Sequence, residues 1–485
     1  MKLRSASIFL LASMLAASLA ACAGEGGGEV QTTVPTDSTA PVTEAVTADP
    51  DYVPDGLPDQ DFGGEEVRIL TTTWYDAQKY IYAAETTGEI VNDMLFQSRS
   101  VVENRFNVSV ALTVDGELGV TNTLFHNAVL AGETVYDILY HHDLQTMQAA
   151  LNGDFLNMRE IECIDFEKPW WTKTSEDFTI ADRLYCTSSH LSLAGVYLNY
   201  ILAINKDLAA AYDLTIPYDD VRAGTWYADD LIAMCREIPQ DLNGDGKMGE
   251  EDQYGFLSSF YGNMGMQSNF GGAVIGKDTD GNLTVLDNTD RMVSVLEKIE
   301  QLYEYGTDAY GADNEYGMPM FVRGQGLFSI TESRVLMDQA RDTDFAWGVL
   351  PFPKYDESQK EYTSSGCDIY WGIALTADER KEMIGTVIEA LSCENYNHVL
   401  PAVWEMMLGT KLSDAPDDSD MFAVIRDAQY VDLGYAFSGQ SSMLTQVVFL
   451  VENTTSGKVA SYMDSRMKGL SNFVNKINEA YTELP

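Results

Sequence analysis

The sequence predicts an α/β protein built on an open, largely parallel sheet. Short apolar runs typical of buried strands alternate with longer segments of helical periodicity, beginning at Val67. Such alternation favours sheets covered by helices. We find no repeat of 20–50 residues, which argues against a solenoid. With 485 residues, 45% of them hydrophobic, the chain is long enough for two or three domains with real cores.

The first part of this pattern predicts three strands separated by two helices. Val67–Leu70, Val108–Leu112 and Tyr136–Tyr140 are the strand candidates. Residues 89–106 and Thr121–Ala131 carry apolar positions at helical spacing. This order is that of a parallel α/β unit.

A second region starts near Cys186 with a strand candidate over Val196–Asn205. Thr225 is a plausible N-cap for a helix that runs to about Glu237, because its hydroxyl can accept a bond from the first turn. The remaining predicted elements are strands at Gly326–Ile330 and Ala346–Leu350 and helices at Arg291–Tyr305, Asn397–Leu408 and Val459–Tyr481.

The N-terminus has the features of an export signal. Lys2 and Arg4 precede an apolar run, Ile8–Leu19, that is too short to span a bilayer. The run ends in Leu19-Ala20-Ala21-Cys22, which resembles the lipobox of bacterial lipoproteins. The resemblance implies that residues 1–21 are a signal peptide and that Cys22 is lipidated. No later stretch reads as a membrane span, so we expect an anchored protein that does not cross the membrane.

Residues 22–64 form the next predicted segment, a disordered tether. From Ala23 to Gly64 it contains no Lys or Arg and is rich in Gly, Thr, Pro and acids, a composition that cannot bury a core. The whole chain has 30 Lys and Arg against 75 Asp and Glu, a net charge of −45. This balance excludes a nucleic-acid binder and favours solubility.

The cysteines of the expected mature body do not form a recognisable framework. They are odd in number and widely spaced, without a C-x-x-C motif: Cys163, Cys186, Cys235, Cys367 and Cys393. Buried thiols are the favoured interpretation. Whether Cys163 and Cys186 pair is left open by the sequence.

Four further segments resemble the extracellular solute-binding proteins of the maltose-binding type. They are Ile204-Asn205-Lys206-Asp207-Leu208, Gly224-Thr225-Trp226-Tyr227-Ala228-Asp229-Asp230-Leu231, Phe321-Val322-Arg323-Gly324-Gln325-Gly326-Leu327-Phe328 and Val349-Leu350-Pro351-Phe352-Pro353-Lys354. Each resembles a family motif, respectively Tyr-Asn-Lys-Asp-Leu, Thr-Trp-Asp-Glu-Leu, Phe-x-x-Gly-Lys-Ala-Ala-Met and Leu-Pro-x-Pro. Their order and spacing over residues of about 66–485 make the resemblance specific.

The resemblance implies a periplasmic-binding-protein-like fold of type II, with two α/β lobes joined by a hinge that the chain crosses about three times. Residues 65–185 and 353–395 would form lobe 1, and residues 186–352 and 396–485 lobe 2. A solute, most plausibly an oligosaccharide, would bind in the cleft between lobes. The protein would be a monomeric receptor on the extracytoplasmic face of a bacterial membrane, without enzymatic activity, that serves an ABC importer.

Candidate ligand-binding residues were chosen at predicted strand ends, because sugars need aromatic faces for stacking and planar polar groups for hydroxyls. Several of these positions match those where the resembling family places its sugar contacts. The candidates are Trp74, Tyr75, Asp76, His141, Asp143, Phe260, Tyr261, Glu332, Asp368 and Trp371. For each one, packing in the core or on the surface is an equally good interpretation. Trp74, Tyr261 and Trp371 are expected to face one another across the cleft.

The segment Asp241–Asp252 matches the Ca²⁺ loop of an EF-hand. Asp241, Asn243 and Asp245 occupy the alternating ligand positions, and Gly246 permits the sharp turn that follows. Lys247 would contribute its backbone carbonyl, and Asp252 stands where the bidentate Glu usually is. We expect a structural Ca²⁺ site, with an acidic turn as the alternative.

Three alternatives were weighed on the same residues. His141-His142-Asp143 contains Zn²⁺ ligand types, but adjacent strand residues point to opposite faces. A secreted, lipid-anchored glycoside hydrolase remains open, because acid pairs are common in this chain. A receptor of the same fold for peptides or another solute also remains open, and a cleft poor in aromatic rings would favour it.

Overall fold

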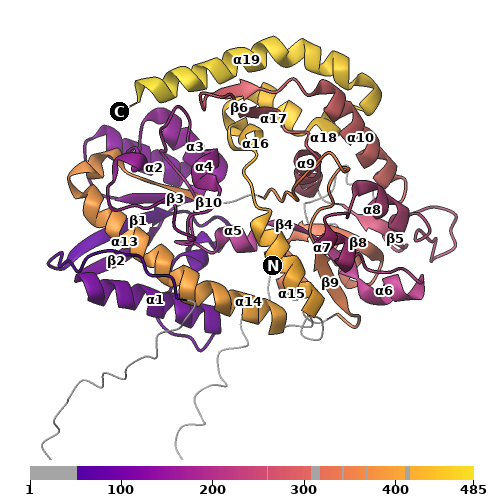
Figure 1. Cartoon of the computed structure of the whole chain (residues 1–485), viewed down its shortest axis with the longest axis horizontal. Coiled ribbons are helices and arrows are strands. Elements are labelled where there is room, and N and C mark those ends of the chain that lie inside the picture. The colour runs from indigo at the N-terminus through magenta and orange to yellow at the C-terminus, as the bar shows by residue number, and fades with distance from the viewer. Residues whose placement is uncertain are drawn as a thin grey trace, which may run out of the picture. The chain divides into compact units, whose positions relative to one another are not determined.

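The computed structural model describes residues 52–258, 260–306, 317–340, 343–366, 369–409 and 416–484. Its first sheet has the strand order β10-β3-β1-β2 (Figure 1). The central strands β1 (Glu65–Thr71), β2 (Val108–Val114) and β3 (Ile138–His142) are parallel, and β10 (Ile369–Ile373) joins β3 antiparallel. The three strands predicted in this region are confirmed, as is their parallel arrangement.

Helices cover both faces of this sheet. On one face α1 (Ile90–Phe106) packs against α13 (Lys381–Glu394), and on the other α2 (Leu118–Leu130) packs against α3 (Asp143–Asn152) (Figure 1). The α1 helix buries Val91, Leu95, Val102 and Phe106, a spacing that keeps one apolar stripe on the sheet. Short helical segments of this lobe are η1 (Trp74–Tyr80), η2 (Met158–Glu160), α4 (Thr174–Asp177) and η3 (Leu375–Arg380).

A buried carboxylate ties the strands of the first sheet together. Asp137, just before β3, is fully buried and accepts two bonds of 3.0 Å from the guanidinium of Arg68 on β1. Arg380 at the end of η3 donates to the same carboxylate at 2.5 Å. Because both acceptor oxygens are satisfied by cations, this charge can be buried between the sheet and its flanking helix.

The second sheet is mixed, with parallel and antiparallel neighbours. Its order is β5-β8-β4-β9, formed by β4 (Tyr200–Asn205), β5 (Tyr254–Leu257), β8 (Gly326–Glu332) and β9 (Trp347–Leu350). β4 is antiparallel to both β8 and β9, whereas β5 and β8 are parallel. Apolar runs buried on both faces look alike in either direction, so strand polarity was not readable from the sequence.

Helices surround the second sheet and extend the lobe away from it. They are α5 (Ala194–Tyr197), α6 (Lys206–Ala211), α7 (Tyr218–Ala223), α8 (Ala228–Cys235), α9 (Phe260–Asn269), α10 (Thr289–Tyr303), α11 (Gly317–Val322) and α12 (Ser333–Gln339), with a hairpin of β6 (Ile275–Lys277) and β7 (Leu283–Val285). Two boundaries differ from expectation. Residues 194–197 are helical and the strand starts at Tyr200, while Tyr227, not Thr225, is the N-cap of α8.

Three segments connect the sheets. The first leads from Thr187, which bridges to Trp371, to Asn199, which bridges to Gly366 on the second, returning segment. A Cβ at Gly366 would lie 2.8 Å from the carbonyl oxygen of Leu198, so this close approach requires glycine. The third is helical throughout, from α13 through the π-helical η4 (Asn395–Val399) into α14 (Leu400–Gly409).

The C-terminal segments return to both sheets. They comprise α15 (Pro416–Asp427), α16 (Leu433–Ala436), η5 (Ser438–Gln440), α17 (Ser442–Val448), α18 (Leu450–Asn453), η6 (Ser456–Lys458) and α19 (Val459–Glu483). The long α19 contacts α3 beside the first sheet and α10 and β7 beside the second (Figure 1). Its buried positions, including Val459, Met463, Leu470 and Val474, confirm the helical pattern expected for this segment.

The chain is held to the first lobe from Tyr52 onward, earlier than the expected end of the tether at Gly64. The backbone N–H of Val53 donates to Asn397 at 2.9 Å, and the hydroxyl of Tyr52 donates to Glu394 at 3.2 Å. Leu57 and Phe62 also pack on the core. The overall polar composition of this segment led to the prediction of a tether, although it contains these few apolar residues. The predicted signal peptide, Cys22 and the first part of the tether lie outside the described residues.

Two further features concern the chain as described. Cys163, Cys186, Cys235 and Cys393 are all free thiols, so Cys163 and Cys186 do not pair; Cys367 lies outside the described residues. None of the helices in the described ranges combines the length and the apolar character needed to cross a membrane.

Candidate ligand-binding cleft

A cleft of about 820 Å³ is lined by residues from both lobes. This volume falls within the range of about 300–1,000 Å³ found for small-molecule sites. The lining residues are Trp74, Tyr75, Leu118, His142, Leu144, Gln145, Tyr200, Glu332, Tyr435, Ser438, Gly439, Thr445, Gln446, Phe449, Glu452 and Asn453. Aromatic rings and polar side chains therefore share one cavity, the combination that sugar recognition needs.

Trp74 and Tyr75 form the first wall, directly after β1. Their rings stack with centroids 4.1 Å apart, and Trp74 meets the ring of His142 edge-on at 4.5 Å. The backbone N–H and hydroxyl of Thr73 both donate to the carbonyl of Gly116 at 3.0 Å, which anchors the turn to the end of β2. The expected placement of these two rings at a strand end is what the structure shows.

The same segment contains backbone strain. Tyr75 has φ 49° and Asp76 has φ 51°, two consecutive residues other than glycine in the left-handed region. Each such residue costs about 1–2 kcal/mol unless its surroundings compensate. The side chain of Asp76 is exposed and does not line the cleft.

Two histidines at the end of β3 point in different directions. His142 lines the cleft, and its Nδ1 lies 2.8 Å from a carboxylate oxygen of Asp143, which is itself fully buried. His141 is buried on the other side, where its Nε2 is 2.9 Å from the carbonyl oxygen of Leu118. Burial lowers the pKa of His141 to about 4. Of the sequence candidates His141 and Asp143, neither reaches the cleft; their neighbour His142 does.

The second lobe contributes Tyr200 and Glu332 and closes on the first through a cation–π contact. The hydroxyl of Tyr200 donates to Glu332 at 3.4 Å. Arg334, two residues later, places Nε 2.8 Å from the Glu332 carboxylate and its guanidinium 4.1 Å from the ring centroid of Tyr75. We call this Tyr75–Arg334 contact the clasp. It joins a residue of each lobe beside the cleft, and Glu332 lines the cleft at the end of β8.

The rest of the cleft is formed by C-terminal helices, which sequence reasoning did not identify. Tyr435 and Phe449 present rings 6.4 Å apart from α16 and the start of α18. Glu452 on α18 accepts a bond of 3.3 Å from the side-chain amide of Asn263 on α9. No motif marks these residues, because they reach the cleft only through the return of the chain after α15.

Trp371 does not line the cleft, which corrects its expected role as a ring platform. It is fully buried on β10, with its ring 5.9 Å from that of Trp171 inside the first lobe. A ring at the third position of a short edge strand can face either side of the sheet, and here it faces the core. Phe260 and Tyr261 begin α9, but their side chains lie outside the described residues, as does Asp368.

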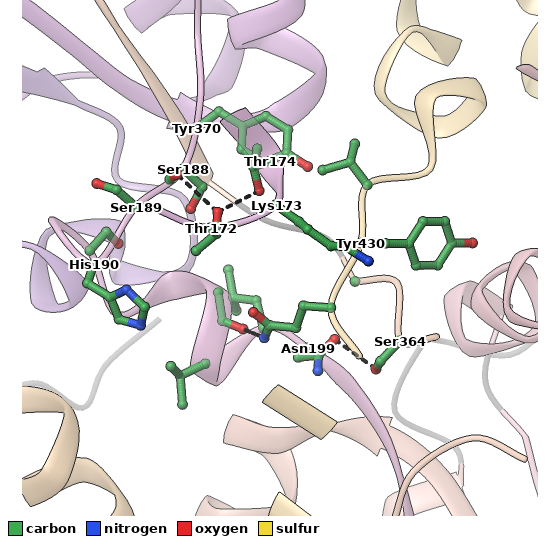
Figure 2. A pocket seen from close by; sticks show the side chains of 17 residues that line it. Thr172, Lys173, Thr174, Ser188, Ser189, His190, Asn199, Ser364, Tyr370 and Tyr430 are labelled. Carbon is green, nitrogen blue, oxygen red and sulfur yellow. Dashed lines mark hydrogen bonds between the residues drawn. The ribbon is translucent and has the colours of Figure 1, made fainter. Parts of the chain in front are cut away.

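A much smaller polar cavity lies where the connecting segments meet (Figure 2). Its volume is about 50 Å³, enough for one or two water molecules but not for a sugar. Thr172 donates to Thr174 at 2.9 Å on one side, and Ser364 donates to Asn199 at 3.1 Å on the other. This small cavity lies among the segments that connect the two sheets, whereas the larger cleft has room for a sugar.

The segment Asp241–Asp252 connects α8 to β5, away from the cleft lining. The N–H groups of Gly244 and Gly246 donate to Asp241 at 2.7 and 2.8 Å, with Gly246 at φ 81°. Asp252 is fully buried and accepts from Leu242 and Gly249. The oxygen-rich donor set suits Ca²⁺. Within the described residues, however, no three His, Cys, Asp or Glu side chains gather as metal ligands, so Ca²⁺ binding stays a prediction.

Solved structures with the same fold are two-lobed binding proteins. A sugar transporter from Rhizobium etli in an open conformation matches with TM-score 0.55 and 12% identity over 87% of this chain and all of its own. A cyclic alpha-maltosyl-1,6-maltose binding protein from Arthrobacter globiformis matches with TM-score 0.55 and 14% identity over 84% and 100%. The maltose/maltodextrin-binding domain from Bdellovibrio bacteriovorus, bound to maltotriose, gives 0.52 and 14% over 84% and 99%.

The family model of the bacterial extracellular solute-binding proteins matches residues 125–382. The chain belongs to this family, and it has the two-lobed, periplasmic-binding-protein-like fold. The family and the matched structures are binding proteins, so the chain is a solute-binding protein and not an enzyme. Its family places it outside the cytoplasm. A search of curated proteins found no match.

Proposed function

We propose that this protein captures an oligosaccharide in the cleft between its lobes and delivers it to an ABC importer. The observation that carries the proposal is the ring-lined cleft. Trp74 and Tyr75 stand on one side, and Tyr200, Tyr435 and Phe449 on the other. Rings on opposing walls fit the apolar faces of pyranose units, and Gln145, Gln446 and Asn453 offer amides for hydroxyls.

Similar proteins support the same ligand class. The matched structures include proteins described as bound to maltotriose, to maltotetraose and to cycloalternan. A cleft poor in aromatic rings would have favoured a peptide receptor. The ring content of this cleft supports a sugar instead.

The proposal also assigns how binding is signalled. The clasp between Tyr75 and Arg334 joins the lobes beside the ligand site. A solute that contacts both walls favours the closed state, because it binds that state more tightly than the open one. The importer would recognise the closed surface. Permease subunits are accordingly the proposed partners, and a lipid at Cys22 would hold the receptor near them.

The central test is a binding screen of purified protein against neutral oligosaccharides, by calorimetry and thermal unfolding, since a ligand that binds only the native state raises its stability. We expect saturable binding that Trp74→Ala weakens strongly. Trp404→Ala serves as the control, because Trp404 lies on α14, outside the cleft lining. Hydrolysis of a bound sugar, or binding of peptides but not of sugars, would contradict the proposal.

The anchor and the importer role need separate tests. Mass spectrometry of the membrane-bound protein should find an acylated Cys22 at the N-terminus, and Cys22→Ala should release the protein from the membrane. Deleting the gene in the producing bacterium should abolish uptake of the bound sugar. Normal uptake without the protein would contradict delivery, while leaving sugar binding intact.

A further inference from the structure

We infer that residues 52–62 form a strap that holds the third connection between the lobes at η4 and thereby favours lobe closure, with Tyr52 and Asn397 as positioning residues. The strap is the part of the predicted tether that the first lobe holds, and it precedes β1. The third connection runs from α13 through η4 into α14. A change in the strap would therefore alter the balance between the open and the closed receptor.

The strap is fixed to the first lobe between its middle and its end. Arg105, near the end of α1, donates to the carboxylate of Asp55 at 2.5 Å and to the carbonyl of Leu57 at 2.9 Å. The backbone N–H of Phe62 donates to the carbonyl of Phe106 at 2.9 Å. Because α1 packs against β2, these bonds make the strap a part of the first lobe.

The first two residues of the strap are bonded to η4 and to the turn before it. The N–H of Val53 donates to Oδ1 of Asn397, and its carbonyl accepts from Nδ2 of the same side chain, both at 2.9 Å. The hydroxyl of Tyr52 donates to Glu394 at 3.2 Å, and its ring lies 5.8 Å from the ring of His398. Two bonds through one planar amide fix both the distance and the orientation of the strap relative to η4.

The π-helical geometry of η4 sets the direction of the third connection. A π-helical turn bonds each residue to the fifth along the chain instead of the fourth, and such turns mark kinks and functional sites in helices. Nδ2 of Asn397 also donates at 2.9 Å to the carbonyl of Cys393, four positions earlier. The side chain that holds the strap therefore also supports the π-helical turn.

A second asparagine joins η4 to the first connection between the lobes. Asn395 is buried, and its Nδ2 donates to the carbonyl of Leu191 at 3.2 Å. Its Oδ1 accepts a bond of 2.6 Å from the hydroxyl of Ser98 on α1. A displacement of η4 would thus be transmitted to two of the three connecting segments.

The direction of the chain after η4 bears on the position of the second lobe. Before η4 the chain stays with the first lobe, since α13 packs against α1. The helix α15, which follows α14, contacts β9 and α7 of the second lobe (Figure 1). In the same arrangement Arg334 reaches the ring of Tyr75 and forms the clasp. A strap that holds η4 stabilises this arrangement, and release of the strap should let the lobes open.

The test measures lobe closure in the purified full chain without any solute, by small-angle X-ray scattering, so its result is independent of the proposed function. We expect Tyr52→Ala and Asn397→Ala each to raise the radius of gyration. The closed-to-open ratio should fall about 5-fold, as the loss of one net hydrogen bond predicts. The double variant should open no further than the more open single variant, because either substitution releases the same end of the strap.

Asp61→Ala is the matched control. Asp61 accepts bonds from Asn107 at 2.7 Å and from the N–H of Gly63 at 2.8 Å, at the opposite end of the strap. Its loss should lower the melting temperature and leave the radius of gyration unchanged, which separates stability from closure. Tyr52→Phe removes a single hydroxyl and provides a milder variant with a smaller rise in radius. An unchanged radius in the folded variants of Tyr52 and Asn397, or an equal rise in Asp61→Ala, would overturn the inference.

Discussion

The two walls of the cleft are built in different ways. The first-lobe wall follows strand ends: Trp74 and Tyr75 come after β1, and His142 ends β3. The second-lobe wall combines Tyr200 and Glu332 of its sheet with the short helices α16–α18 near the C-terminus. A wall at the ends of strands can be located from local sequence. A wall of short helices is formed by segments that are distant in sequence from the sheet they approach. Residues of such a wall can change, and with them the specificity, without disturbing a sheet.

The largest expected effect is that of replacing an aromatic ring of the first lobe by alanine, which should distinguish rings of the core from rings of the cleft. Trp371→Ala should lower the free energy of unfolding by about 3–5 kcal/mol, because it empties a buried site beside Trp171. Trp74→Ala should cost little stability but about 2 kcal/mol or more of binding free energy. Chemical unfolding and calorimetry of both variants measure the two quantities. Loss of stability in Trp74→Ala together with loss of binding in Trp371→Ala would contradict this assignment of the two rings.

The next effect concerns a buried acid that belongs to the first lobe alone. Both oxygens of Glu389 accept indole N–H bonds, from Trp170 at 3.1 Å and Trp171 at 2.9 Å. Burial nevertheless raises the pKa of Glu389 to about 7. Because the folded state then holds a proton that the unfolded state has lost, stability should fall as pH rises from about 4.5 to 7, by about 3 kcal/mol from this group.

Glu389→Gln should remove that loss, so its free energy of unfolding should depend less on pH between 4.5 and 7 than that of the wild type. The matched control is Glu382→Gln, an exposed acid on the same helix, which should keep the wild-type slope. Denaturant unfolding at several pH values measures both. Parallel pH profiles for the wild type and Glu389→Gln would show that the buried acid is not titrating in this range.

A smaller effect belongs to the second lobe. If Asp241, Asn243, Asp245, the Lys247 carbonyl and Asp252 bind Ca²⁺, a tenfold excess over the dissociation constant should stabilise the protein by about 1.4 kcal/mol. Thermal unfolding in CaCl₂ and in EDTA measures this difference. Asp245→Ala should abolish it, whereas Asp280→Ala, in an exposed acidic turn, should not. A melting temperature indifferent to EDTA would restrict this segment to the role of an acidic turn.

The smallest expected effect is that of removing the Tyr75–Arg334 contact, which tests whether the two walls of the cleft are energetically coupled. The Tyr75–Arg334 clasp should contribute about 0.5–1 kcal/mol to the closed state, which a double-mutant cycle with Tyr75→Leu and Arg334→Met can isolate. Two quantities are measured for each variant: the radius of gyration without ligand, which reports lobe closure, and the affinity for the solute. We expect each substitution to lower the affinity about 2- to 5-fold. Tyr462 and Arg466 stack at 3.5 Å within α19 and provide a control pair that should show no such coupling.

The sequence predicted correctly those strands and helices whose spacing of apolar residues matches the face that they bury in the folded protein. The strand around Val67, the helix over 89–106 and the long C-terminal helix each appear where their periodicity places them. The Trp74-Tyr75 pair and Glu332 also lie at the cleft, because the ends of strands in such sheets meet at one edge. The motif resemblance identified the family whose model matches residues 125–382.

Three features were decided by tertiary structure. A shift of one residue along β3 sends His142 to the cleft and His141 into the lobe, because neighbouring strand side chains point to opposite faces. Trp371 faces the core for the same reason. Glu452 reaches the cleft only because the chain returns after α15 and α18 packs on α9. The periodicity of a sequence shows which residues are apolar. The direction of each side chain, and the approach of segments distant in sequence, depend on tertiary packing, which a short stretch of sequence does not contain.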